Sequence, residues 1–460
     1  MRQQFVDKEN IQHLIDGLNK LYEHMVNTNT VDADDIKNFM EPYFEEAGYR
    51  EKSIKSKIKS NKHKIKNDIK NDVKNILIIH DSGIGDFIIT SATIREIRRI
   101  FPKSHITLLI SQFLFAMAEG CPYVDKIVIY NCYLQKYKDF FDFYKNSIDI
   151  VQHLLRRKFD ISFSFGQHPG AFLFSYMTGS KEIIDMHGSI GRFEEDFQSG
   201  IIPADFFESL LTFKTNIEGL KNPHDNERYL QILQNYSKVH IQNKKLEIWF
   251  NPMDNFLAEV NLRAVDNKKL YAISMGSNMQ LTVKRWSPEK YAQLINMILA
   301  EEDAMFVILG GANETKDGEI VESLVEKNHI INLTNKINFR QSAAVLNLCD
   351  CYIGNDTGMI HAAATLKIPV LSPNCFPVDM EMTPASFPQR YYPYNVPSVI
   401  VQPKHALPEC KNSKNKRATG CVADRPHCIN QITPENMFQA FKHLQKQIAK
   451  NATEPVFFNL

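Results

Sequence analysis

The sequence predicts an α/β protein of two domains, because of its length and of two segments with the same order of elements. A chain of 460 residues with 43% hydrophobic and 23% charged residues is long enough for two globular cores. Residues 75–111 read as an apolar strand, a glycine-containing turn, an amphipathic helix and a second strand. Residues 351–371 repeat this order. Alternation of strands and helices predicts parallel sheets covered by helices.

The first segment places a carboxylate where open α/β sheets carry their chemistry. Its strand Ile76–Ile79 ends in a turn with the letters DSGIGD, and Asp86 begins the following helix. Ligands of such sheets bind outside the carboxyl ends of the strands. A dinucleotide fingerprint would require glycine at position 88, which is Ile88, and an acidic residue after the next strand, where the sequence has none. We therefore expect Asp86 to serve a reaction other than hydride transfer to a nicotinamide.

The second segment predicts a helix N-terminus that is open to a ligand. Its letters GNDTG follow a strand and precede an apolar helix. Thr357 is the expected capping hydroxyl, and Gly358 allows phosphate oxygens to approach the backbone N–H groups. Asp356 would then be free to bond sugar hydroxyls. The alternative is that Asp356 or Thr357 only caps the helix.

Four blocks of the sequence resemble glycosyltransferase family 9, the heptosyltransferases that use ADP-heptose to build bacterial lipopolysaccharide cores. The blocks are GIGD at 83–86, YAISMGSNMQLTVKRWSPEKYAQLI at 271–295, FVILGGANE at 306–314 and GNDTGMIHAA at 354–363. The resemblance covers roughly residues 75–445 and implies the GT-B fold, two facing Rossmann-like domains with a cleft between them. We expect the acceptor domain at 75–262 and the nucleotide-sugar domain at 263–450.

A cation is expected to take the place of a metal ion in the donor site. Strand Leu270–Ser274 leads into a loop of small residues with Ser277, and Lys284 follows before a helix. The leaving diphosphate needs a cation, a metal ion or helix dipoles to stabilise its charge. Residues 263–450 contain no metal-binding D-x-D triplet. Lys284 and the helix N-termini are the expected substitute, as the resemblance also implies, although a lysine before a helix can also be a solvated charge.

The resemblance implies further donor contacts at Glu314 and His361. Glu314 follows an apolar strand and is expected to meet the nucleoside ribose, unless it is a solvent-facing loop acid. His361 lies one helical turn beyond Thr357 and could reach the diphosphate or the sugar. The alternative for His361 is an interior histidine whose ring bonds to the backbone.

The acceptor site is expected on the first domain. Gly85 and His168 would line it, although a turn histidine without a catalytic role fits His168 equally well. Residues 177–230 are polar, and we expect them to be irregular and to form the acceptor pocket.

Four of the eight cysteines raise the possibility of a structural metal. Three of them lie in a polar stretch, and four thiolates suit tetrahedral zinc or iron. Their gaps of 34, 10 and 6 residues lack the tight C-x-x-C knuckle, so plain reduced thiols are the other interpretation. Autotransporter heptosyltransferases of this family carry a cysteine-bound iron, which keeps protein glycosylation open as an alternative function. The four residues are Cys375, Cys410, Cys421 and Cys428.

The two ends of the chain lie outside the resemblance. Residues 1–74 are expected to form a helical extension and residues 451–460 a tail. Residues 50–74 hold ten Lys or Arg against three acidic residues, with a narrow Ile/Val stripe. This segment is either a solvated helical linker or a surface helix that holds the protein to anionic lipid.

Composition limits the classes of function. A net charge of +1 argues against a nucleic-acid partner. No apolar run approaches the roughly 18 residues of a membrane span, and the N-terminus lacks a signal-peptide core. We expect a cytoplasmic enzyme that needs no cofactor for catalysis, either free in the cytoplasm or peripheral on the inner membrane face. The expected reaction is an inverting, metal-independent transfer of a heptose or related sugar from an ADP-sugar to a lipopolysaccharide core or another glycan, with Asp86 as base.

Overall fold

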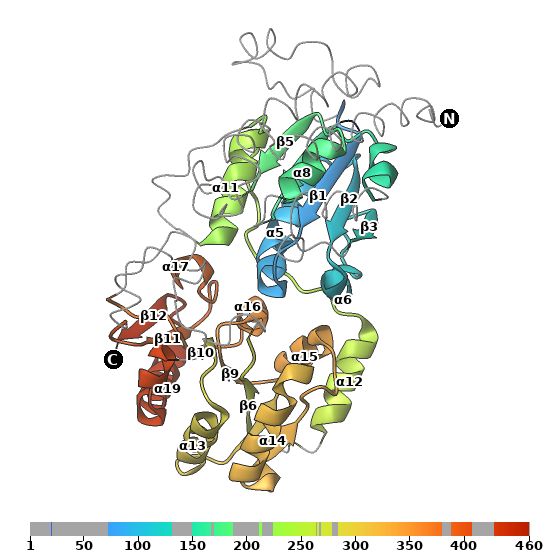
Figure 1. The fold of residues 1–460 in the computed structure, drawn as a ribbon. Coiled ribbons are helices and arrows are strands. Elements are labelled where there is room, and N and C mark those ends of the chain that lie inside the picture. Colours follow the sequence, from blue (N-terminus) through green and yellow to red (C-terminus); the bar gives the residue numbers. More distant parts are fainter. Residues whose placement is uncertain are drawn as a thin grey trace. The chain divides into compact units, whose positions relative to one another are not determined.

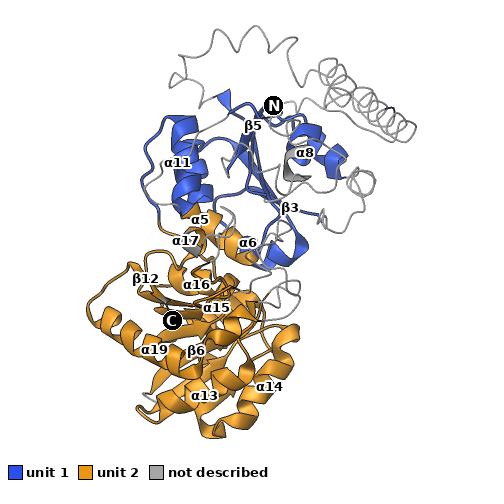
Figure 2. Ribbon diagram, turned by 60° about the vertical axis from the view of Figure 1, so that its left-hand side comes forward, with its two compact units in different colours: residues 1–83, 92–222, 226–244 blue, residues 84–91, 223–225, 245–460 orange. Residues whose placement is uncertain are grey.

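The computed structural model contains two parallel α/β sheets in two compact units (Figures 1 and 2). Unit 1 comprises residues 1–83, 92–222 and 226–244, and unit 2 comprises residues 84–91, 223–225 and 245–460. The structure describes Lys20 and residues 72–130, 150–166, 170–186, 211–213, 224–263, 265, 268–277, 284–379, 388–406 and 427–459. The predicted helical extension therefore lies almost entirely outside the described residues.

Unit 1 is built on a parallel sheet that has five strands over the described residues, in the order β3-β2-β1-β4-β5. The central strand β1 is buried from Ile76 to His80, which explains why its sequence is a continuous apolar run and does not alternate. Since all strands are parallel, their first residues share one edge of the sheet and their last residues share the other. The strands are β1 (Asn75–His80), β2 (His105–Ile110), β3 (Lys126–Ile129), β4 (Ile161–Ser164) and β5 (Glu182–Asp185).

Unit 2 is built on a parallel sheet that has seven strands in the described chain, in the order β12-β11-β10-β9-β6-β7-β8. The chain proceeds from β6 to β7 on one side and returns to β9 on the other. This reversal is the switch point at which open α/β sheets bind ligands. The strands are β6 (Lys269–Ser274), β7 (Ala304–Ile308), β8 (Ile330–Asn332), β9 (Cys351–Gly354), β10 (Val370–Pro373), β11 (Ser398–Gln402) and β12 (Pro455–Asn459).

Helices connect the strands of both sheets (Figure 1). The α-helices are α5 (Ile84–Ile100), α6 (Phe115–Ala118), α8 (Gly170–Met177), α11 (Asp225–Ser237), α12 (Pro252–Leu262), α13 (Pro288–Leu299), α14 (Thr315–Leu324), α15 (Phe339–Leu346), α16 (Gly358–Thr365), α17 (Pro388–Tyr391) and α19 (Pro434–Ala449). Short 3-10 helices are η1 (Gln112–Leu114), η4 (Ala312–Glu314), η5 (Lys327–His329) and η7 (Cys428–Gln431).

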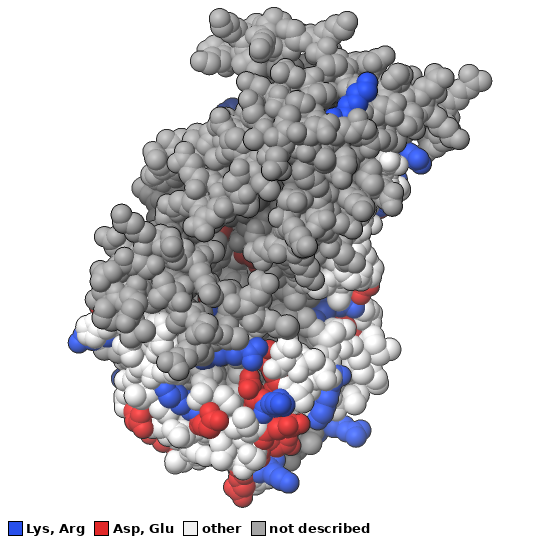
Figure 3. All heavy atoms as spheres, viewed as in Figure 1, with Lys and Arg blue, Asp and Glu red and all other residues white. Residues whose placement is uncertain are grey.

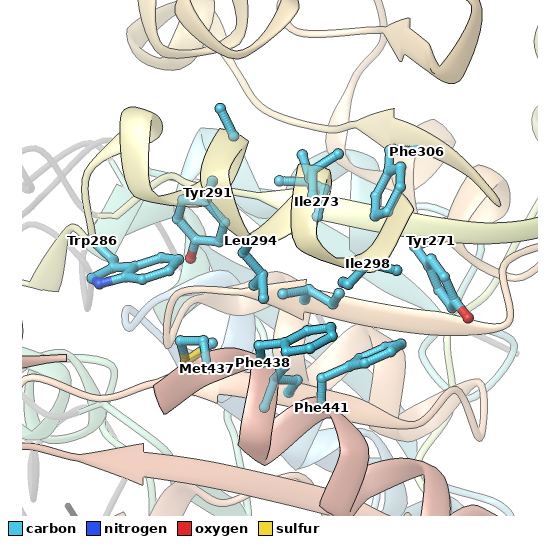
Figure 4. Close-up of a cluster of buried hydrophobic side chains, with 14 of the residues drawn as sticks. Tyr271, Ile273, Trp286, Tyr291, Leu294, Ile298, Phe306, Met437, Phe438 and Phe441 are labelled. Carbon is cyan, nitrogen blue, oxygen red and sulfur yellow. The ribbon is translucent and has the colours of Figure 1, made fainter. Parts of the chain in front are cut away.

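An aromatic-rich core between the second sheet and helices α13 and α19 fixes the start of α13. Side chains of α13 and α19 pack with those of β6 and β7 in this cluster (Figure 4). Trp286 is almost fully buried, and its indole N–H donates to the carbonyl of Ile432 at 2.9 Å. Buried aromatic side chains of this size dominate core energetics. The core therefore anchors the backbone two residues beyond Lys284.

Helix α12 packs within unit 2, although it precedes the predicted domain boundary at residue 262. Its Asp254 caps the helix in a reciprocal capping box with Asn251. The same carboxylate accepts a hydrogen bond from Arg340 of α15 at 2.6 Å, and both side chains are buried. This ion pair holds α12 against α15.

Two expectations about irregular segments need correction. Residues 177–230, expected to be irregular, include β5 and the start of α11. A four-residue strand is too short to show a clear period in the sequence, although Ile183 and Ile184 are fully buried. The expected tail contains β12, whose residues pair in parallel register with β11.

Charged side chains of both signs are interspersed over the described face of unit 2 in Figure 3. Among the described helices, none combines the length and the apolarity needed to cross a membrane.

Candidate functional site

The predicted donor residues gather at the switch point of the second sheet. The loop 275–277 follows β6, and the turn 355–357 follows β9. These segments emerge side by side because Ser274 pairs with Gly354 in the parallel register. Glycine is required at 354, since an added Cβ would overlap the backbone carbonyl of Ser274.

The buried amide of Asn355 ties the two segments together. Its Nδ2 donates to the carbonyl of Met275, and its Oδ1 accepts from the hydroxyl of Tyr291 at 2.8 Å. The backbone N–H of Trp286 donates to the same oxygen at 3.3 Å. Both ends of the amide are thus satisfied in the protein interior. Asn355 thereby fixes the position of the next residue, Asp356. Asn355 is not among the site residues predicted from the sequence.

Lys284 and Asp356 form an ion pair at this edge. The Lys284 ammonium donates to Oδ2 of Asp356 at 3.0 Å, and the two side chains are 19% and 20% exposed. Burial opposes both charges, but the charge of Lys284 and the hydrogen bond from it hold the pKa of Asp356 below its ordinary value. Burial lowers the pKa of Lys284, but the charge of Asp356 outweighs this effect, so the pKa of Lys284 lies above its ordinary value. Both groups are therefore charged at neutral pH.

The first turn of α16 has the predicted cap. The Thr357 hydroxyl accepts a hydrogen bond from the backbone N–H of Met359 at 3.3 Å. Gly358 has a packing role in addition to the predicted one, because an added Cβ would lie only 3.2 Å from the backbone nitrogen of Gly85. The start of α5 and the start of α16 therefore lie in close contact within unit 2.

His361 is a buried, neutral imidazole beside this contact. His361 is 6% exposed, and burial is the main reason why its pKa falls to about 4. Nδ1 has no hydrogen-bond partner among the described residues. A Cβ added at Gly85 would lie 2.5 Å from Cδ2 of His361. An unsatisfied ring nitrogen in the protein interior is costly unless a ligand completes it.

Asp86 lies next to Gly85 in the first turn of α5. Asp86 is partly exposed. The charge of Asp86 helps to raise the pKa of Lys284, so the two groups are within electrostatic range. A carboxylate, a cation and a neutral imidazole thus surround the start of α16. These groups can accept a proton, stabilise an anion and give or receive a hydrogen bond.

Arg285 links the other predicted donor residues. Its Nε donates to Oγ of Ser277 at 3.1 Å, and its Nη2 donates to Oε1 of Glu314 at 3.2 Å. Nη1 donates to Asp317 at 3.4 Å. Arg285 lies in the block 271–295, but no role was predicted for it. The only feature of the sequence that points to Arg285 is its position beside Lys284.

Glu314 is not a solvent-facing loop acid. The residue is 8% exposed, and its Oε2 accepts from the backbone N–H of Gly311 at 2.7 Å. A Cβ added at Gly276 would lie 2.9 Å from its carboxyl carbon. Glu314 therefore lies against the loop that follows β6, on the same sheet edge as Ser277.

The cysteine hypothesis falls partly outside the described residues. Cys375 is partly buried and Cys428 is buried, and Sγ of Cys428 lies 2.9 Å from Nδ1 of His427. Cys410 and Cys421 are not described, and neither is His168. Within the described ranges, no group of three or more His, Cys, Asp or Glu side chains is arranged to hold a metal ion. The four-cysteine site stays a prediction.

Comparison with known proteins finds similarity to one family over part of the chain. The model of glycosyltransferase family 9 (heptosyltransferase) matches residues 209–411. A candidate glycosyltransferase of Haemophilus influenzae is 25% identical over 334 residues, which cover 70% of this chain and 86% of that protein. A lipooligosaccharide heptosyltransferase 2 of Campylobacter jejuni is 23% identical over 227 residues, which cover 49% of this chain and 65% of that protein.

A solved structure agrees with the predicted fold class. The ADP-heptose lipopolysaccharide heptosyltransferase II of E. coli superimposes with a TM-score of 0.55 at 15% identity, covering 82% of this chain and 99% of that one. This likeness confirms the two parallel-sheet α/β domains of the GT-B class. Together with the sequence matches, it supports a glycosyltransferase that is similar to the heptosyltransferases of family 9.

Proposed function

We propose that this protein transfers a heptose from ADP-heptose to the core of a lipopolysaccharide or lipooligosaccharide. The similar lipooligosaccharide heptosyltransferase of C. jejuni and ADP-heptose lipopolysaccharide heptosyltransferase of E. coli support this donor and this class of acceptor. They favour a glycan acceptor over the protein acceptor of the autotransporter enzymes. The observation that carries the proposal is the convergence of Asp86, Lys284 and His361 around the start of α16.

The diphosphate of the donor is assigned to Lys284 and the N-terminus of α16. An ammonium has three N–H donors, so Lys284 can keep its bond to Asp356 and still bind a phosphate oxygen. The helix N-terminus, with Thr357 and Gly358, adds partial positive charge. Asp356 has a second carboxylate oxygen for a sugar hydroxyl, and Nδ1 of His361 is the further ligand contact.

The nucleoside is assigned to the edge that Arg285 organises. Ser277 offers a hydroxyl there, and Glu314 offers carboxylate lone pairs to the ribose hydroxyls. The buried carboxylate is held from two sides, by Arg285 and by the N–H of Gly311. A fixed acceptor loses little conformational freedom when the ligand binds.

Asp86 acts as the general base in the proposed reaction. It takes the proton of the acceptor hydroxyl, and the oxygen attacks the anomeric carbon opposite the diphosphate. The new C–O bond forms as the bond to the phosphate oxygen breaks, which inverts the anomeric configuration. Base catalysis contributes roughly 10²–10⁴-fold. Lys284 and the helix N-terminus stabilise the negative charge on the leaving ADP, so the chemistry requires no metal ion.

The acceptor is assigned to the side of Gly85 and His168, and the basic segment 50–74 to contact with an anionic membrane. This places the enzyme at the inner face of the cytoplasmic membrane. Any metal on Cys375, Cys410, Cys421 and Cys428 would be structural zinc or iron, and no step of the reaction passes through it.

The proposal is tested by incubating the protein with ADP-heptose and a heptose-deficient core oligosaccharide in the presence of EDTA. We expect the acceptor to gain the mass of one heptose residue, and NMR to show inversion at the anomeric carbon. Binding of ADP-heptose without transfer to any core acceptor would contradict the proposal. UDP- and GDP-sugars serve as matched controls for the nucleotide.

A further inference from the structure

Four basic side chains cluster at the edge of the first sheet where its strands begin. Lys126 is the first residue of β3, and its Nζ lies 2.7 Å from Nε2 of His153. His153 lies on a helical stretch at residues 150–155, and Arg156 and Arg157 follow it directly, before β4. His153 and Arg156 are exposed, and Lys126 and Arg157 are partly exposed. All four can therefore meet a partner from solvent.

No acidic side chain compensates this cluster within the described residues. Burial and then the charge of Arg157 lower the pKa of Lys126, while burial followed by Lys126, Arg157 and Arg156 lowers the pKa of His153. Neither arginine forms an ion pair with a described residue. Other basic residues of unit 1 do form such pairs, as Lys181 does with Asp160 at 2.8 Å. Like charges held together are unfavourable until an anion neutralises them.

The polybasic segment 50–74 ends beside this cluster. The backbone N–H groups of Lys74 and Asn75 donate to the carboxylate of Asp160 at 2.7 and 3.0 Å. Asp160 lies three residues beyond Arg157 and immediately before β4. The end of a segment with ten basic and three acidic residues thus shares an edge with the four-residue cluster. The opposite edge of this sheet is the one at which β1 ends and α5 begins.

We propose that this edge, with Lys126, His153, Arg156 and Arg157, docks on an anionic phospholipid surface. A membrane is favoured over a nucleic acid because the neighbouring segment 50–74 combines its basic residues with an Ile/Val stripe, which suits a lipid surface. A basic patch next to a polybasic segment is typical of proteins that bind anionic leaflets. The choice of partner rests on the proposed membrane-borne acceptor, but the docking surface does not depend on which sugar is transferred. Vesicle binding and sugar transfer are separate measurements.

The test uses the full-length protein and sedimentation with vesicles. Vesicles of phosphatidylcholine with about a third phosphatidylglycerol are compared with pure phosphatidylcholine, from low to several hundred millimolar salt. Arg156→Gln/Arg157→Gln removes two charges from the cluster. The control Lys446→Gln/Lys450→Gln removes two charges from exposed positions at the end of α19. Circular dichroism and turnover of a soluble acceptor confirm that each variant is folded.

We expect the wild-type protein to bind only the anionic vesicles, and to release them at high salt. The Arg156/Arg157 variant should bind them roughly 30-fold more weakly at low salt, because each basic side chain near an anionic surface contributes a factor of about five. The Lys446/Lys450 control should bind the anionic vesicles within about threefold of wild type, because its two lysines lie outside the cluster. Equal loss in both variants, undiminished binding by the Arg156/Arg157 variant, or binding of single-stranded RNA with no binding of anionic vesicles would overturn the proposal. Loss of vesicle binding with normal turnover would support it.

Discussion

The ammonium of Lys284 donates a hydrogen bond to the carboxylate of Asp356 across 3.0 Å, although the two residues stand 72 positions apart in the sequence. Two features hold the pair in place. Asn355 fixes the turn that carries Asp356, and Trp286, anchored in the core, fixes the backbone after Lys284. The result is a cation that is charged before any ligand arrives, so no group has to reorganise when negative charge develops on a leaving diphosphate.

Lys284→Ala is expected to weaken donor binding and to slow transfer together. Loss of one preorganised charge-stabilising group costs roughly 10²–10³-fold in turnover. Turnover is measured at saturating donor, and donor affinity by calorimetry with ADP-heptose. Lys327→Ala, which removes an exposed lysine of η5, is the matched control and should behave as wild type. An unchanged rate and affinity in Lys284→Ala would remove Lys284 from the donor site.

The buried His361 should make stability depend on pH. Because its pKa in the folded protein is about 4, below the ordinary value of 6.5, the unfolded chain binds more protons between these values. The stabilisation is therefore fully present above pH 6.5 and is lost as the pH falls toward 4, by up to about 3 kcal/mol. Urea unfolding of wild type and His361→Gln at several pH values measures this difference.

In that experiment, His240→Gln is the control, since His240 is exposed. The difference in unfolding free energy between wild type and His361→Gln should narrow as the pH falls from 7 to 4.5. A difference that does not change over this range would show that His361 titrates alike in the folded and unfolded chains.

Gly85→Ala should destabilise the protein because the new methyl group would collide with His361. The new methyl group would lie 2.5 Å from Cδ2 of His361, and overpacking of this kind costs about 1–3 kcal/mol. A double-mutant cycle with His361→Ala measures the coupling. The cost of Gly85→Ala should largely vanish in the His361→Ala background. Equal costs in both backgrounds would mean that the two residues are not in contact in solution.

Arg285→Lys is expected to raise the KM for the donor by roughly tenfold, the value of about one lost charge-assisted hydrogen bond, with little change in kcat. A lysine cannot reproduce the planar fork that reaches Ser277, Glu314 and Asp317 at once. Steady-state kinetics with varied ADP-heptose separates the two parameters. Asp317→Asn, at the longest of the three contacts, should have a smaller effect. A fall in kcat at unchanged KM would instead place Arg285 near the reacting atoms.

The sequence predicted those features that depend on local order. Apolar runs such as Ile76–Ile79 identified the central strands, and the letters around Thr357 identified a capped helix start, which the structure confirms. Asn355 and Arg285 escaped prediction because their partners lie far along the chain, such as Tyr291, 64 positions from Asn355. An amide or a guanidinium has no local pattern that reveals such partners.

Short edge elements escaped for a different reason. Strands β5 and β12 have four and five residues, which is too few for a period to stand out from a loop. Both become strands because a neighbouring strand supplies the other half of the hydrogen-bond ladder. Tertiary context, which the sequence does not display locally, decides such cases.

In the proposed mechanism, Asp86 is the base of a metal-independent sugar transfer. Single-turnover transfer from ADP-heptose to a core acceptor, with EDTA and saturating substrates, tests it in the wild type and in Asp86→Asn, which keeps the shape of the side chain. We expect the variant to bind ADP-heptose as tightly as the wild type and to transfer roughly 10²–10⁴-fold more slowly. A variant that retains more than about a tenth of the wild-type rate would contradict the role of Asp86 as base.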